Sequence, residues 1–227
     1  MWGGDALNPF AAQKASRFPD DAQRFSILAT ELANVGSGFY GRGWVLGTSG
    51  NFSAVFWSDP LRLVITSSGV DKGNLSAEHF LEIDETGDVV RGNYKPSAEM
   101  LLHLQIVRAR GAGAVLHTHS VWSTVLSDVC APDGGLAIEG YEMLKGLSGV
   151  QTHEHREWLP LIENSQSMVS LAETVSNVLE QHPVAHGFLL KRHGLYTWGA
   201  DVAEAKRHVE ILEFLMETLV WRMRVKP

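Results

Sequence analysis

The sequence has one cysteine, no long apolar run and no excess of positive charge. Cys130, the single cysteine in 227 residues, cannot form an internal disulfide, which fits a reducing cytoplasm. We find no uninterrupted apolar stretch near the roughly 20 residues of a transmembrane helix, and no signal-peptide pattern at the start. A formal net charge of −7 disfavours binding to nucleic acids or anionic membranes, which need a basic face. We therefore expect a cytoplasmic protein that binds neither nucleic acid nor membrane.

The overall composition is that of an ordinary globular domain. Hydrophobic residues make up 44% of the chain and charged residues 20%, which is enough to enclose one sizeable core. No repeat, low-complexity tract or linker divides the sequence. We expect a single domain over residues 1–227, with residues 1–18, which are weakly patterned, forming a loose arm.

Segments with helical spacing and short extended runs alternate along the chain. Apolar spacing and capping residues predict helices over residues 20–33, 97–110, 121–126 and 167–181, and from Asp201 onward. The glycines between residues 36 and 43 are expected to break the first helix. Short apolar or alternating runs predict strands over residues 51–57, 61–66, 79–83, 89–91, 158–162, 186–191 and 195–198. Without strict strand–helix alternation, this order predicts an α/β fold with a largely antiparallel central sheet and helices on its faces.

Two histidines stand at the end of a further apolar run that begins at Ala114. Side chains alternate faces along a strand, so His117 and His119 are expected to point the same way. His193, also at the end of an apolar stretch, is a third candidate ligand. Three neutral imidazoles with one open position are typical of a catalytic zinc site.

A second pair with the same spacing, His153 and His155, provides an internal comparison. It lies in a polar run over residues 151–157 that is typical of a solvated loop, so we interpret this pair as non-functional. The other histidines have no partner at ligand spacing and are interpreted as structural or surface residues; they are His79, His103, His182, His186 and His208.

Three turns rich in glycine and hydroxyl residues lie at residues 47–51, 66–69 and 95–97. Glycine lets backbone N–H groups approach an anion, hydroxyl groups add donors, and the third turn precedes a predicted helix. Each turn alone is most often an ordinary turn, but together with a metal site they predict a phosphate pocket. Lys72 is by default a surface lysine and could add positive charge. The candidate phosphate-binding residues are Ser49, Gly50, Asn51, Ser67, Ser68, Gly69, Lys72 and Ser97.

Two glutamates are candidates for acid/base catalysis. Glu99 follows the third turn, at the start of a predicted helix, and Glu142 stands among apolar and glycine residues. Either could act as a general acid or base if the fold brings it beside the metal. Spacing alone does not choose between them.

Taken together, these segments resemble the class II aldolase/adducin family over about residues 20 to 220. The similarity rests on Ser49–Asn51, Thr66–Gly69, Pro96–Glu99, His117–His119 and Arg192–Gly194. Residues 68–73, 142–146, 162–164 and 192–199 are more similar to a dehydratase branch of that family. Ser67 replaces a proline of the aldolase pattern and Ala98 replaces a serine, which disfavours a sugar aldolase.

The resemblance implies an α/β/α sandwich with one Zn²⁺ per subunit held by His117, His119 and His193. It implies a sugar-phosphate substrate bound through its phosphate by the three turns, and a homotetramer with active sites near subunit interfaces. The dehydratase branch dehydrates a methylthio-substituted ketose phosphate in methionine salvage, and it favours Glu142 as the acid/base, with Glu99 second. The alternatives are an aldolase or 4-epimerase of fuculose or ribulose phosphate, in which Glu99 is the catalytic carboxylate, and an adducin-like interaction module without catalysis. The three histidines argue against the last.

Overall fold

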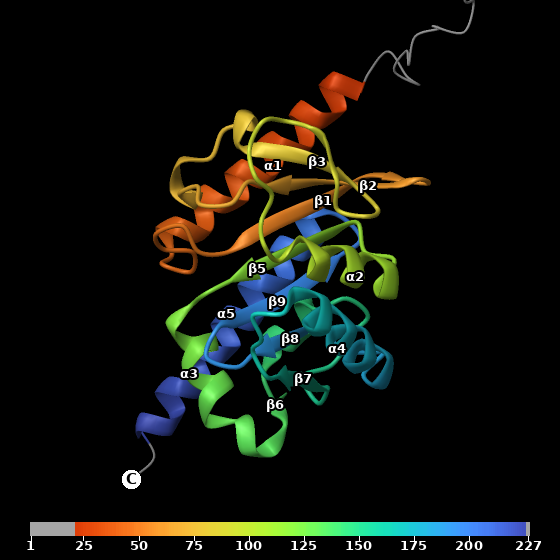
Figure 1. Cartoon of the computed structure of the whole chain (residues 1–227). Helices are drawn as coiled ribbons and strands as arrows, with labels where there is room; N and C mark the ends of the chain where they lie inside the picture. The colour runs from red at the N-terminus through yellow and green to blue at the C-terminus, as the bar shows by residue number, and fades with distance from the viewer. Residues whose placement is uncertain (1–20, 226–227) are drawn as a thin grey trace, which may run out of the picture.

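One mixed sheet runs through the molecule, and helices cover both of its faces (Figure 1). The computed structural model describes residues 21–225. The strands within this range are β1 (Asn51–Ser58), β2 (Leu61–Thr66), β3 (Phe80–Asp84), β4 (Val89–Arg91), β5 (Ala114–Thr118), β6 (Gly135–Glu139), β7 (Arg156–Ile162), β8 (Gly187–Leu190) and β9 (Gly194–Gly199). The helices are α1 (Asp21–Gly41), α2 (Met100–Arg110), α3 (Val121–Val129), α4 (Met168–Gln181) and α5 (Val202–Val225), with short 3₁₀ turns η1 (Lys72–Asn74), η2 (Ala77–His79), η3 (Ala131–Asp133) and η4 (Glu142–Gly146).

The strand order is β4-β3-β2-β1-β5-β9-β8-β7-β6. Neighbouring strands are antiparallel except β7 and β8, which run parallel. In Figure 1, α2 and α4 lie in front of the sheet, and α1 and α5 lie behind it. The predicted α/β/α sandwich around a mostly antiparallel sheet is therefore confirmed.

The central strands are apolar on both faces because each face is covered. Along β5, Val115 packs into the core beneath α2 and α4, whereas Ala114 and Leu116 pack into the core beneath α1. Along β2, Leu63 likewise packs into the first of these two cores and Val64 into the second. This two-sided burial explains why these strands have continuous apolar runs rather than a strict alternation with polar residues.

Most predicted elements lie close to their observed bounds, but three differ. The predicted break at the glycines after residue 35 is wrong, because α1 continues to Gly41. Helix α2 begins at Met100 rather than at Ser97, and β6 was not predicted. The loose arm predicted for residues 1–18 lies outside the described residues.

Gly36 explains why a glycine-rich segment remains helical. A Cβ atom at this position would lie 2.8 Å from the carbonyl oxygen of Lys72 and 2.8 Å from Leu75 Cδ1. The glycine thus allows α1 to pack closely against η1, and this tertiary contact outweighs the low helix propensity of glycine.

No helix within residues 21–225 is both long and apolar enough to cross a membrane.

We expect Gly36→Ala to destabilise the protein by about 1–3 kcal/mol, because the added methyl group overpacks the contact between α1 and η1. Gly38→Ala is the matched control, since a Cβ atom there meets nothing within 4 Å. The control is expected to stabilise the helix by about 0.5–1 kcal/mol through loss of glycine's backbone entropy. Urea denaturation of both variants measures the two changes, and equal signs would contradict this explanation of Gly36.

Candidate metal and substrate site

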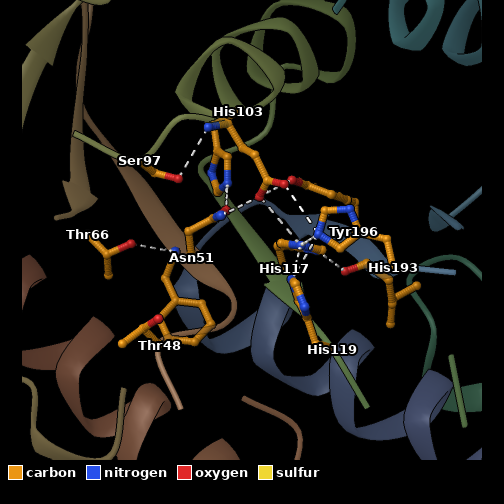
Figure 2. Close-up of polar contacts among 12 residues, drawn as sticks. Thr48, Asn51, Thr66, Ser97, His103, His117, His119, His193 and Tyr196 are labelled. Carbon is orange, nitrogen blue, oxygen red and sulfur yellow. Dashed lines mark hydrogen bonds and ion pairs between the residues drawn. The ribbon is translucent and has the colours of Figure 1, made fainter. Parts of the chain in front are cut away.

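The three candidate ligands meet where β5 ends beside the turn between β8 and β9. His117 is in β5, His119 follows it, and His193 lies in the turn between the two later strands. Figure 2 shows the three rings pointing toward one another. The Nε2 atoms of His117 and His119 are 2.7 Å apart, those of His119 and His193 are 3.0 Å apart, and those of His117 and His193 are 3.3 Å apart.

The donor set of this histidine cluster fits a divalent metal ion. The Nδ1–H of His117 donates to the carbonyl oxygen of Leu195 at 2.9 Å, which leaves the Nε2 lone pair facing the other two rings. A neutral imidazole carries one N–H, so a closed triangle of Nε2 atoms cannot be satisfied by hydrogen bonds alone. Tetrahedral zinc–nitrogen bonds would place the nitrogens roughly 3.3 Å apart, which matches the distance between His117 and His193 and exceeds the other two by a few tenths of an ångström.

Burial keeps His117 and His119 in the neutral form that binds metals. It lowers the pKa of His117 well below its ordinary value and that of His119 to about 3, and electrostatic repulsion from neighbouring side chains adds to both shifts. Metal and proton compete for the same lone pairs, so a low proton affinity leaves the ligands free at neutral pH.

Glu99 lies directly beside the cluster. Its Oε1 is 3.3 Å from His193 Nε2, and its Oε2 is 3.5 Å from His117 Nε2. The Oε2 atom also accepts hydrogen bonds from Asn51 Nδ2 at 2.6 Å and from the Tyr196 hydroxyl at 2.7 Å. Burial and the charge of Glu99 raise the pKa of Tyr196 well above its ordinary value, so the hydroxyl remains a donor. These two donors fix the carboxylate next to the metal ligands.

A buried relay orients Asn51, which Figure 2 shows between His103 and the histidine cluster. The Ser53 hydroxyl donates to His103 Nδ1 at 2.7 Å, so the His103 Nε2–H faces and donates to Asn51 Oδ1. The amide nitrogen of Asn51 is therefore turned toward Glu99. The sequence did not single out Ser53 or Tyr196, and the structural interpretation of His103 omitted this relay. The sequence feature that could have indicated this relay was the position of His103 on the apolar side of a predicted helix.

The three glycine–hydroxyl turns converge on one cavity of about 320 Å³ next to the histidine cluster. The structure brings together all the candidate phosphate residues around it, and His119, Glu99 and His193 are also part of the lining. The turns support one another, since Ser68 N donates to the Lys95 carbonyl oxygen at 2.9 Å.

Lys72 is buried rather than exposed, so its default interpretation as a surface lysine is wrong. Its side chain is 1% exposed, and Nζ donates to the carbonyl oxygens of Thr48 and Val70 at 3.0 and 2.7 Å. Burial lowers the pKa of Lys72 to about 8, although the neighbouring Asp71 opposes this shift. The ammonium group is thus still largely charged at pH 7, at the wall of the cavity.

Two glycines allow the backbone to approach closely at this site. Gly50 has a φ of +73°, and a Cβ atom there would lie 2.7 Å from the carbonyl oxygen of His117. A Cβ atom at Gly194 would lie 1.9 Å from the carbonyl oxygen of Thr118. Larger residues at either position would push β1 or β9 away from β5 and would move the residues of the site apart.

The turn that carries His193 is held in an unusual conformation. Arg192 has a φ of 54°, in the left-handed region that non-glycine residues rarely adopt. Its backbone N–H donates to the Ser127 hydroxyl at 2.9 Å, and its guanidinium donates to Asp128 at 2.8 Å. Helix α3 therefore fixes the turn and, with it, the position of the third ligand.

Glu142 lies apart from the histidine cluster of its own chain. Its carboxylate is exposed on η4, where it accepts a hydrogen bond from Lys145 Nζ at 2.7 Å and lies 3.9 Å from His153 Nδ1. The hydrogen bond and charge of Lys145 lower the pKa of Glu142. Of the two candidate carboxylates, the fold places only Glu99 beside the histidines within residues 21–225 of one chain.

The two histidines of the second pair, His153 and His155, have different surroundings. His153 is exposed, as the interpretation of a solvated loop predicts. His155 instead contacts the buried carboxylate of Glu157, together with His186, which directly precedes β8. For His155 the interpretation of a solvated loop is therefore wrong.

Comparison with known proteins agrees with this geometry. Residues 30–220 match the family model described as Class II Aldolase and Adducin N-terminal domain. The chain belongs to this family. The resemblance in the sequence motifs is thereby confirmed, and membership agrees with a histidine group that could bind a metal.

Among individual proteins, methylthioribulose-1-phosphate dehydratase of Hahella chejuensis is 41% identical over 91% of this chain and 99% of its own length. The protein of the same name from Pseudomonas fluorescens is 44% identical over 84% and 90%. Among solved structures, the putative aldolase/epimerase/decarboxylase YgbL of Escherichia coli is 26% identical, with a TM-score of 0.74, over 89% of this chain and 92% of that one. An L-fuculose 1-phosphate aldolase, 21% identical with a TM-score of 0.73 over 89% of each chain, shares the fold.

The relay behind Asn51 predicts a pH dependence of stability. Burial lowers the pKa of His103 to about 3, so the folded protein keeps this ring neutral while the unfolded chain protonates it below about pH 6.5. The unfolded state then binds more protons, and stability falls as the pH drops from about 6.5 to 3.

Urea denaturation in the presence of a chelator, from pH 7 to 4, tests this with wild type and His103→Gln. The wild type is expected to lose up to about 1.4 kcal/mol per pH unit more than the variant. Parallel pH profiles of the two proteins would contradict the assignment of a neutral, buried His103.

Proposed function

We propose that this protein is a zinc-dependent dehydratase that converts 5-methylthioribulose 1-phosphate to 2,3-diketo-5-methylthiopentyl 1-phosphate. The observation that carries the proposal is the convergence of three imidazoles, a fixed carboxylate and a glycine–hydroxyl cavity at one point. The proposed substrate follows the name of the related methylthioribulose-1-phosphate dehydratases, which are 41–44% identical over most of the chain. We also propose one catalytic Zn²⁺ per subunit and a homotetramer, and the cytoplasmic location stays a prediction from composition.

His117, His119 and His193 would hold the ion. When bound, it polarises the C2 carbonyl of the substrate and so acidifies the proton on C3. The cavity turns would receive the 1-phosphate through backbone N–H groups and hydroxyls, and Lys72 would supply the positive charge. With the phosphate so placed, C2 and C3 of the sugar would lie toward Glu99 and the histidines.

Dehydration needs a base for the C3 proton and an acid for the departing C4 hydroxyl. The C3–H and C4–O bonds break, a C3=C4 double bond forms, and the hydroxyl leaves as water with one added proton. The resulting enol gains a proton at C4 and loses the proton of its C3 hydroxyl, which gives the diketone. Glu99 is held as an acceptor by Asn51 and Tyr196 and is suited to position or remove a proton at the metal side. We propose Glu142 as the acid for the C4 hydroxyl, contributed by a neighbouring subunit.

The exposed surface next to the site supports a contribution across an interface. Helix α3 starts two residues after His119 and exposes Val121, Val125 and Val129, which follow one another at four-residue spacing on one side of the helix. Such an apolar stripe is typical of a subunit interface. Glu142 is itself exposed on η4, with the exposed Met143 next to it, and is free to face another copy.

A side-by-side assay with methylthioribulose 1-phosphate and fuculose 1-phosphate tests the reaction. We expect diketone formation from the first and no aldehyde release from the second. His119→Ala is expected to lose the catalytic metal and activity, while His153→Ala, the exposed histidine of the other pair, retains the metal. Aldehyde release from fuculose 1-phosphate would instead support the aldolase alternative, which the position of Glu99 beside the ligands favours.

Mixed oligomers test the role of Glu142. We expect Glu142→Gln to retain metal and lose most turnover, whereas Glu139→Gln, a nearby exposed carboxylate paired with Arg156, remains active. Co-expression of Glu142→Gln with His119→Ala should restore about a quarter of wild-type activity, since that fraction of random subunit pairs joins an intact metal site to an intact Glu142. An inactive mixture would place Glu142 in its own chain's site, and an active Glu142→Gln with a dead Glu99→Gln would assign the acid to Glu99.

A further inference from the structure

A second group of metal-type ligands lies where the parallel strands β7 and β8 begin. His155 stands just before β7, Glu157 is in it, and His186 directly precedes β8. The Glu157 Oε2 atom is 2.9 Å from His155 Nε2 and 2.8 Å from His186 Nδ1. The three ligand atoms all lie within 4.8 Å of one another. None of these residues belongs to the histidine cluster of the active site.

The surrounding contacts prepare these side chains as ligands. The carbonyl oxygen of Ser148 accepts a hydrogen bond from His186 Nε2–H at 2.8 Å, which directs the Nδ1 lone pair to Glu157. The other carboxylate oxygen, Glu157 Oε1, accepts the backbone N–H of His186 at 2.9 Å. Metal-ligating histidines usually donate their second N–H to a carbonyl or carboxylate, as His117 does to Leu195 in the active site.

Charge and burial also favour a cation at this point. The Glu157 side chain is 1% exposed, so its carboxylate needs a positive partner. With Nδ1 of His186 presenting a lone pair to the carboxylate oxygen, a positive particle is needed between them, either a proton or a metal ion. Two imidazoles with one glutamate form an established ligand set for zinc with one open position.

Space for a fourth ligand lies beside the group. His155 and His186 line a cavity of about 560 Å³, together with Glu204 and His208. Water in this cavity can fill the open coordination position. The donor spacing of 2.8–2.9 Å is a few tenths of an ångström shorter than the roughly 3.3 Å of tetrahedral zinc, so both imidazole rings would move back slightly from Glu157 when the ion enters.

We propose that His155, Glu157 and His186 bind a second divalent metal ion of the zinc type, which joins the beginnings of β7 and β8. The backbone ladder between these strands pairs Leu161 with Leu189 and Ile162 with Leu190, near their carboxyl ends. The ligand group lies at the opposite ends of the same strands, where it would bind them together.

Counting bound metal tests the proposal. Each protein is equilibrated with Zn²⁺, dialysed and analysed by elemental mass spectrometry. We expect two ions per chain in wild type, one in His119→Ala, one in His155→Ala and none in the double variant. His153→Ala is the matched control, since this histidine has the same sequence spacing but is exposed, and it should retain two.

A stability measurement supports the count without using activity. In the His119→Ala background, added Zn²⁺ should raise the Tm, because it binds only the folded chain. The Tm of His119→Ala/His155→Ala should not respond, whereas His119→Ala/His153→Ala should respond like the single variant. If His155→Ala folds poorly, His155→Gln replaces it.

Two outcomes would overturn the proposal. The first is a His119→Ala protein that binds no zinc and shows no Tm response, which would leave a proton as the particle between Glu157 and His186. The second is equal metal content in His155→Ala and His153→Ala. Because the count in His119→Ala does not depend on turnover, failure here leaves the proposed dehydratase untouched.

Discussion

The position of β5 between β1 and β9 is the constraint on which the whole site depends. This pairing sets Asn51 opposite His117 on one side and Tyr196 opposite His117 on the other. The hydrogen-bond donors to Glu99 therefore come from the two neighbouring strands, and His117, the first candidate ligand, lies between them. The strands come this close at the site because Gly50 and Gly194 lack a Cβ atom that would strike the backbone of β5.

An acidic chain can still present an anion-binding cavity because its charges are local. The net charge of −7 belongs to the whole molecule, whereas the cavity wall contains the ammonium group of Lys72 and three turns rich in glycine and hydroxyl residues. Carbonyl oxygens of Thr48 and Val70 hold that ammonium group in place. The proposed phosphate site thus combines a fixed cation with backbone dipoles, and it needs no basic surface.

Local pattern was enough to predict most of the fold, and contacts between distant residues account for what it missed. The bounds of β2 and β4 follow from short apolar runs between turn residues, and the three candidate metal ligands follow from histidines at strand ends. Helix α1 continues through Gly36 because of its contact with η1, which no local rule includes. The carboxylate of Glu157, which His155 contacts, also meets His186 29 residues away, and the relay from Ser53 depends on the packing of α2 against β1, so neither arrangement could be found from spacing.

The order of pairing also determines when the site can form during synthesis. Strand β5 is central, but its partner β9 follows it by more than seventy residues and lies just before the last helix. A ribosome-bound chain that ends before β8 can pair β1 with β5 and bring Asn51 to His117, yet it has neither His193 nor Tyr196. Assembly of the three-histidine cluster is therefore one of the last events of folding, and a truncated chain carries two imidazoles at an unpaired strand edge.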